Sequence, residues 1–283
     1  MKRLLPWLAA AAVLSLSAAS AKTAFPAYPS EWWAPLGAQE RVLLLSAADL
    51  LGHPVRDRRN RTVGAIAYLA TDARTGDISF ALVGSGDRLV PVPWALIEER
   101  EADGALRLAS DGDGLRRAPA VTEARLGELT RTALLIQVYD HYRVPSAQRR
   151  LQAKSAEVPL LLVGRSAITT LPLSTARGAE VVKADGRSLG AVERMMIDPA
   201  LGRVAFVLVG FGGFVGLGED WLPVPFSALR WHPGRAFFTL NLDPTRLTAM
   251  PTFAKEEPAM LVSVSDLRAL YNRYSVPPYW RRG

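Results

Sequence analysis

The feature that most constrains this chain is an internal repeat, because residues 41 to about 146 are written a second time at about 167 to 277. Equivalent residues lie 126 positions apart in the first part of the repeat and 132 positions apart in the second part, so the second copy carries a six-residue insertion. Such self-similarity predicts one supersecondary plan used twice. Each copy, at roughly 100 residues, is large enough for a hydrophobic core of its own. The clearest identities are Gly52 with Gly178, Gly64 with Gly190, Asp72 with Asp198, Gly76 with Gly202, Pro91 with Pro223, Tyr139 with Tyr271 and Pro145 with Pro277.

The segment ahead of the repeat has the pattern of a secretory signal. Lys2 and Arg3 precede an apolar stretch at 4–16, and small residues at 19–21 suit a signal peptidase that cuts after Ala21. A membrane anchor is the rival interpretation, but the stretch contains serines and is short for a bilayer span of about 20 residues. We therefore expect a cleaved signal and a periplasmic or secreted protein.

The absence of cysteine limits the chemistry of the chain. It rules out disulfides, thiolate metal sites and cysteine nucleophiles, so an exported protein must be held by its cores. Without Lys2 and Arg3, 32 basic residues remain against 27 acidic ones, a net charge of +5. Arginine clusters at 56–61, 149–150 and 281–282 are either solvated loops or sites of attraction to anionic lipid or acidic polymers. Export argues against nucleic acid as the partner.

Within each copy, a turn that opens with Asp and closes with Gly separates two β-rich runs. The turns are 72–76 and 198–202, and the runs that follow them, 78–83 and 204–209, are rich in β-branched and aromatic residues. Asp at the start of a turn and Gly where positive φ is needed predict a β-hairpin in each copy.

The second half of each copy begins with two prolines at i and i+2, in 90–94 and 222–226. Because proline has no amide donor, this strand cannot pair continuously on one side, and we expect an edge, an end or a bulge. A short helical turn and a returning strand follow. Apolar residues at helical spacing over 123–142 and 263–274 then predict a helix that closes each copy.

Together these elements predict a mainly β fold of two tandem small β-barrels, each with a short C-terminal helix. The expected boundaries are a signal peptide at 1–21, a proline- and aromatic-rich segment at 22–40, a first barrel module at 41–146, a linker at 147–166 and a second barrel module at 167–283.

The order of hairpin, Gly-rich loop, proline-bearing strand and small helix resembles the PRC-barrel domain, which is named for the photosynthetic reaction centre H subunit and shared with a bacterial ribosome maturation factor. Residues 174–253 resemble the family pattern nearly throughout, and residues 49–121 resemble it without the Gly-rich insertion. The resemblance implies a compact β-barrel that serves as an assembly or contact module, with no catalytic residues carried by the pattern. It indicates a fold more directly than a function.

The Gly-rich segment 210–218 does not fit a dinucleotide-binding loop, because a valine stands where the third glycine is required and a strand-like sequence follows. It is either a hairpin loop at the barrel rim or a partner-contact loop. Two adjacent tryptophans near the N-terminus are a second candidate contact, with packing inside the molecule as the alternative. The predicted contact residues are Phe211, Gly212, Gly213, Phe214, Val215, Leu217, Trp32 and Trp33.

No group of residues in the sequence forms a coherent catalytic or metal-binding motif. The three histidines, His53, His141 and His232, are scattered, and no G-x-S-x-G elbow accompanies them. Arg273 stands at the position equivalent to His141, so the repeat accepts a permanent cation there. We expect no catalytic residue, no cofactor and no metal.

These observations predict an exported, non-catalytic binding or assembly protein of the bacterial envelope with a protein partner. Two alternatives stay open. One is an envelope hydrolase whose site lies between the two modules, and the other is a peripheral protein that binds an anionic membrane surface through its arginine clusters.

Overall fold

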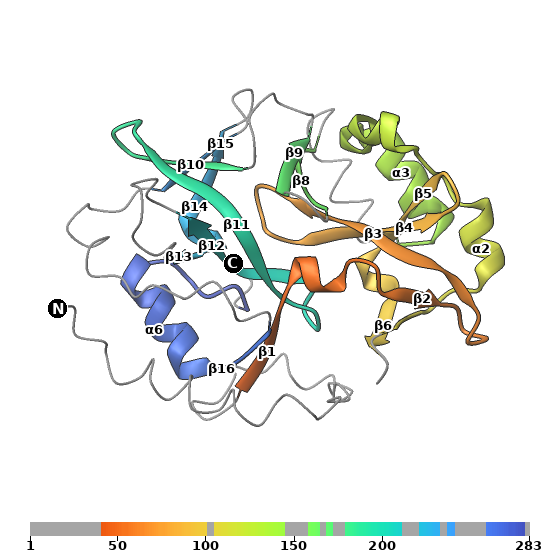
Figure 1. Cartoon of the computed structure of the whole chain (residues 1–283), viewed down its shortest axis with the longest axis horizontal. Coiled ribbons are helices and arrows are strands. Elements are labelled where there is room, and N and C mark those ends of the chain that lie inside the picture. Colours follow the sequence, from red (N-terminus) through yellow and green to blue (C-terminus); the bar gives the residue numbers. More distant parts are fainter. Residues whose placement is uncertain are drawn as a thin grey trace, which may run out of the picture.

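The computed structural model describes residues 41–100, 105–144, 158–164, 168–171, 179–210, 221–232, 237–240 and 259–280. The fold is mainly β, as the sequence predicts, and in this part of the chain the strands form two sheets of eight strands each (Figure 1). Short helices pack against both sheets.

The first sheet has the strand order β5-β4-β3-β2-β7-β6, with β8 beside β3 and β9 beside β8. Its strands are β2 (Pro54–Arg56), β3 (Thr62–Asp72), β4 (Ile78–Ser85), β5 (Arg88–Pro93), β6 (Ile97–Arg100), β7 (Leu106–Leu108), β8 (Leu160–Val163) and β9 (Ile168–Leu171). The helical elements of this part of the sequence are the 3₁₀ turns η3 (Ala47–Leu50), η4 (Trp94–Leu96) and η5 (Glu123–Thr130) and the α-helices α2 (Gly112–Arg117) and α3 (Thr132–His141).

The second sheet has the order β13-β12-β11-β10-β15-β14, with β1 beside β11 and β16 beside β1. Its strands are β1 (Arg41–Ser46), β10 (Glu180–Lys183), β11 (Ser188–Asp198), β12 (Arg203–Gly210), β13 (Trp221–Pro225), β14 (Leu229–His232), β15 (Phe237–Leu240) and β16 (Ala259–Ser263). The helical elements are η6 (Phe226–Ala228) and α6 (Val264–Tyr274).

The repeat in the sequence is also a repeat in the strand pairing. Val55 lies opposite Gly64, and the residues 126 positions later, Val181 and Gly190, pair in the same way. Both sheets also contain one parallel pair at the same place, β2 with β7 and β10 with β15. The two predicted hairpins are confirmed as β3–β4 and β11–β12.

The prediction that the proline-bearing strand is an edge, an end or a bulge is confirmed in both sheets, where this strand is an edge. β5 and β13 each carry two prolines and stand at the end of the strand order, each paired with a single strand. Proline costs no ladder hydrogen bond on an open side, which is why the edge accepts it.

Each half of the molecule receives a strand from the other half's stretch of chain. β1 opens the first copy of the repeat, yet it pairs with β11 and β16 in the second sheet (Figure 1). Reciprocally, β9 opens the second copy and joins the first sheet, where it pairs with β8, which in turn pairs with β3. The second sheet is therefore built from two separate stretches of chain, β1 and β10 to β16, whereas the first sheet uses the continuous stretch from β2 to β9. The backbone of β1 ties the two halves to each other.

A single hydrophobic cluster runs through both halves. Leu44 of β1, Ile66 of β3 and Phe206 of β12 are all buried members of it. α6 is held over the second sheet by two tyrosines whose hydroxyls donate to strand carbonyls, Tyr271 to Ala205 O and Tyr274 to Pro223 O. A smaller cluster packs α3 on the first sheet, with Tyr139 against Phe80.

Candidate functional site

All of the predicted contact residues lie outside the part of the chain that the structure describes. The structure does place the ends of the Gly-rich segment, since Gly210 at the end of β12 lies opposite Trp221 at the start of β13. The segment thus joins two antiparallel neighbours. In the first sheet the equivalent connection is the turn between β4 and β5, at Gly86. The residues outside the described part are Phe211, Gly212, Gly213, Phe214, Val215, Leu217, Trp32 and Trp33.

The place where the two halves meet is the location that the hydrolase alternative requires, and it is closely packed. The amide of Ile78 donates to Gly202 O, and the equivalent amide, that of Val204, donates to Gly76 O, both at 2.8 Å. The two Asp–Gly turns therefore pair with each other by a local two-fold relation. Beside them, the guanidinium Nε of Arg203 lies 2.9 Å from Asp77 Oδ1.

Large aromatic side chains cover the glycines of these turns. A Cβ added to Gly202 would lie 2.4 Å from Cδ1 of Trp94, and one added to Gly76 would lie 2.7 Å from Cδ1 of Phe226. The indole of Trp94 also donates to Pro199 O at 3.1 Å. Aromatic rings thus occupy the space beside both turns, which suits a structural junction.

The turn of the second hairpin also holds a buried carboxylate. Asp198 accepts hydrogen bonds from the amides of Ala200 and Leu201 and, at 2.9 Å, from the hydroxyl of Tyr279. Burial raises the pKa of Asp198, and the three hydrogen bonds oppose that rise. Arg203 donates to Tyr279 O as well, so the segment after α6 is fastened to the turn. These contacts give the carboxylate of Asp198 a structural role, because it holds the turn and the segment after α6 together.

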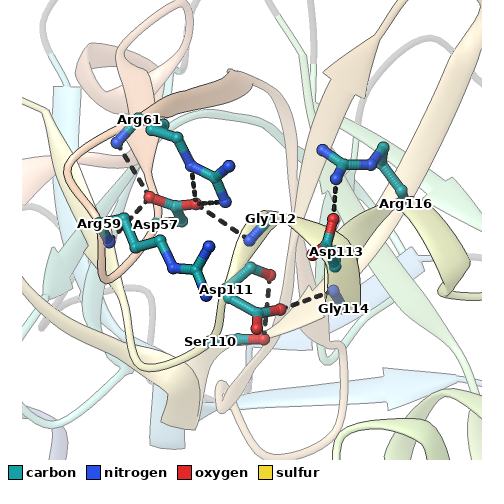
Figure 2. A network of polar contacts seen from close by, with 9 residues as sticks. All are labelled: Asp57, Arg59, Arg61, Ser110, Asp111, Gly112, Asp113, Gly114 and Arg116. Atoms are coloured by element: carbon teal, nitrogen blue, oxygen red, sulfur yellow. Dashed lines mark hydrogen bonds and ion pairs between the residues drawn. The ribbon is translucent and has the colours of Figure 1, made fainter.

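A second buried carboxylate, Asp57, organises the arginine-rich hairpin between β2 and β3. Its side chain is fully buried, and Oδ1 accepts from the amides of Arg59 and Arg61, both at 2.9 Å (Figure 2). Oδ2 accepts from the guanidinium of Arg61, at 2.9 Å from Nε and 2.7 Å from Nη2, and from the amide of Gly112 at 3.1 Å. Burial by itself raises the pKa of Asp57, but the hydrogen bonds from Arg61, Gly112 and Arg59 outweigh it and lower the pKa to about 2.

The bond to Gly112 joins this hairpin to a segment about fifty residues away in the sequence. The amide of Arg58 also donates to Ser110 O, at 3.2 Å. α2 begins directly after this contact, with Asp111 as its N-cap accepting from the amide of Gly114. Figure 2 shows the hairpin and α2 side by side, with the buried carboxylate between their backbones.

This arrangement brings two groups of arginines together. Asp113 pairs with Arg116 within α2. We use the name arginine surface for the five exposed arginines of the hairpin and of α2, which are Arg58, Arg59, Arg61, Arg116 and Arg117. The cluster at 56–61 is visible in the sequence, but the pair at 116–117 could not be joined to it, because nothing local in the sequence says that these two segments meet.

His141 has a structural contact beside the same surface. Its Nε2 lies 2.8 Å from Gly114 O. Because a carbonyl oxygen only accepts, Nε2 carries the proton and donates, which ties the end of α3 to α2. Among the described residues, no three His, Asp or Glu side chains gather in a way that would hold a metal ion.

Residues 169–237 match the family model of the PRC-barrel domain. The chain contains a PRC-barrel domain. The matched region runs from β9 to the start of β15 and includes the hairpin, the Gly-rich segment and the proline-bearing edge strand. A search of curated proteins finds no match to the chain. Within the described ranges, no helix is both long enough and apolar enough to cross a bilayer.

Proposed function

We propose that this chain is an exported, non-catalytic binding or assembly protein of the bacterial envelope, built from two tandem PRC-barrel modules that each end in a short helix. The first sheet, of which the family model matches only β9, repeats the pairing of the second sheet, and this supports a second module of the same kind.

The observation that carries the proposal is the way the chain uses its buried carboxylates. Asp57 and Asp198 are buried acids of the kind from which catalytic acids and bases are drawn. Here both carboxylates accept hydrogen bonds from loop amides and from a neighbouring arginine or tyrosine side chain. Such side chains hold loops in fixed positions, and a rigid loop surface is what a binding module presents to a partner.

The test is a capture experiment from envelope extract with the mature chain, 22–283, and with a variant that lacks residues 211–216. We expect the mature chain to retain a specific protein that binds it again when both are purified. Loss of that protein on deletion would assign the contact to the Gly-rich segment. Equal retention would move the contact to Trp32 and Trp33 or to another surface.

The hydrolase alternative makes a different prediction. It requires turnover of envelope polymers by the purified chain, with the activity lost on substitution of His141. Turnover of that kind would contradict the proposal. Cell fractionation, with the signal segment intact or replaced, tests export separately, since a chain that stays in the cytoplasm would contradict the envelope location.

A further inference from the structure

We propose that the arginine surface is a binding site for the phosphate headgroups of an anionic phospholipid membrane. The inference deepens the proposed function, on which it rests, because it names the chemistry of one partner and the residues that meet it. The guanidinium group suits this role, since it stays charged and presents a fork of donors that matches phosphate oxygens.

The surface is held in place before any ligand arrives. Asp57 fixes the hairpin through the amides of Arg59 and Arg61, and its bond to Gly112 fixes the hairpin against α2. The backbone positions of the exposed arginines are therefore set by a buried carboxylate, and less backbone entropy is lost when a ligand binds.

The second copy of the repeat shows which of these arginines the fold itself needs. Arg61 pairs with Asp57, and at the equivalent position Arg187 pairs with Asp185, so both hairpins keep this arginine. The other four arginines of the surface are not kept. In the second copy, Ala184 stands for Arg58, Asp185 for Arg59, Thr248 for Arg116 and Ala249 for Arg117.

Three of the arginines found only in the first copy give its hairpin and α2 positive charges that are not paired with acidic side chains in the described part of the chain. Within the described residues, the side chains of Arg58, Arg59 and Arg117 have no hydrogen-bond or ion-pair partner. Residues 56–61 and 110–117 together carry six arginines against three aspartates, a net charge of +3. The equivalent residues, 182–187 and 242–249, carry one lysine and two arginines against two aspartates, a net charge of +1.

A membrane fits this surface better than a protein does. Protein interfaces are centred on buried apolar or aromatic side chains. The exposed residues of the hairpin and of α2 are polar or charged, namely Arg58, Arg59, Asn60, Arg61, Thr62, Arg116 and Arg117. A polar surface with excess arginine is suited to a repeating array of negative charges, where each basic residue near the membrane contributes ~1 kcal/mol.

The experiment is co-sedimentation of the mature chain with large vesicles of phosphatidylglycerol and phosphatidylcholine at low salt. We expect binding that is weak on pure phosphatidylcholine and that falls as salt is added. The variant Arg58→Gln/Arg59→Gln keeps the Arg61–Asp57 pair and should bind about 30-fold more weakly, the factor that corresponds to two arginines at ~1 kcal/mol each. The control is Arg41→Gln/Arg230→Gln, which removes the same charge from two exposed arginines of the second sheet and should change binding less than about threefold.

Three results would overturn the inference. The first is no binding to the anionic vesicles, and the second is an equal loss in the two variants, which would mean that net charge alone is responsible. The third is arginine-dependent binding to soluble polyglutamate without binding to vesicles, which would assign the surface to an acidic protein. These outcomes are separate from the capture experiment, because a chain with a protein partner and no vesicle binding keeps the proposed function and loses only this inference.

Discussion

The contact between Trp94 and Gly202 offers a direct test of how the two halves of the molecule are joined. Gly202 has φ of 61°, and a Cβ added there would lie 2.4 Å from Cδ1 and 2.9 Å from Nε1 of Trp94. Gly86 has nearly the same φ, 64°, but nothing lies within 4 Å of its added Cβ. Alanine at Gly86 therefore reports the backbone cost alone, and alanine at Gly202 reports that cost together with the collision.

The expected magnitudes follow from these two environments. An alanine in the left-handed region costs about 1 kcal/mol, so Gly86→Ala should lower the free energy of unfolding by about that amount. At Gly202 the indole must also move, which adds overpacking of ~2 kcal/mol. Trp94 is buried and its Nε1 donates to Pro199 O, so displacement breaks a hydrogen bond as well. We expect a total loss of about 3 kcal/mol for Gly202→Ala.

The assay is urea unfolding followed by circular dichroism and by tryptophan fluorescence, whose agreement checks that one transition is measured. A double-mutant cycle with Trp94→Ala then isolates the contact. If the collision is the cause, Gly202→Ala in the Trp94→Ala background should cost no more than Gly86→Ala. Equal losses for Gly202→Ala and Gly86→Ala in the wild-type background would refute the reasoning.

Two further predictions concern charged groups. Because the folded-state pKa of Asp57, about 2, lies below the value of ~3.9 in an unfolded chain, its contribution to stability is present above pH ~4 and is lost as the pH falls towards 2. The free energy of unfolding of Asp57→Asn should thus be lower than that of the wild type at pH 6, and the gap should narrow in acid; a constant gap would contradict this account. Asp77→Arg places a like charge opposite Arg203 in a half-exposed pair, so we expect a loss of ~1 kcal/mol that shrinks in about 1 M salt, and a loss that is insensitive to salt would mean that packing is the cause.

The hairpins were predictable because their signals lie within a few residues. Asp72 accepts the amide of Arg74, and Asp198 accepts those of Ala200 and Leu201, as the side chain of a residue that opens a turn does. Gly76 and Gly202 then take positive φ, which closes each turn. The proline pairs predicted edge strands for an equally local reason, the missing amide donor.

The arginine surface was predictable only in part. The cluster at 56–61 is visible in the sequence, but the burial of Asp57 and its bond to the amide of Gly112 depend on β2 lying beside β7. A sequence signal did exist in the comparison of the two copies, since Arg61 is kept as Arg187 while Arg58 and Arg59 are not. That comparison separates the arginine with a structural partner from those without one.

By itself, the sequence determined that one β plan is used twice, where the turns and edge strands of that plan fall, and that the plan resembles the PRC-barrel domain. These features were accessible because they depend on local dihedral preferences and on the similarity of the two copies. Only the tertiary structure decided that β1 joins β11, that β8 joins β3, and that the Asp–Gly turns pair with each other. The physical reason is that backbone hydrogen bonds are alike for any two strands, so the choice of partner rests on side-chain packing between distant segments. Trp94 over Gly202 and Phe226 over Gly76 are contacts of that kind, between residues more than a hundred positions apart in the chain.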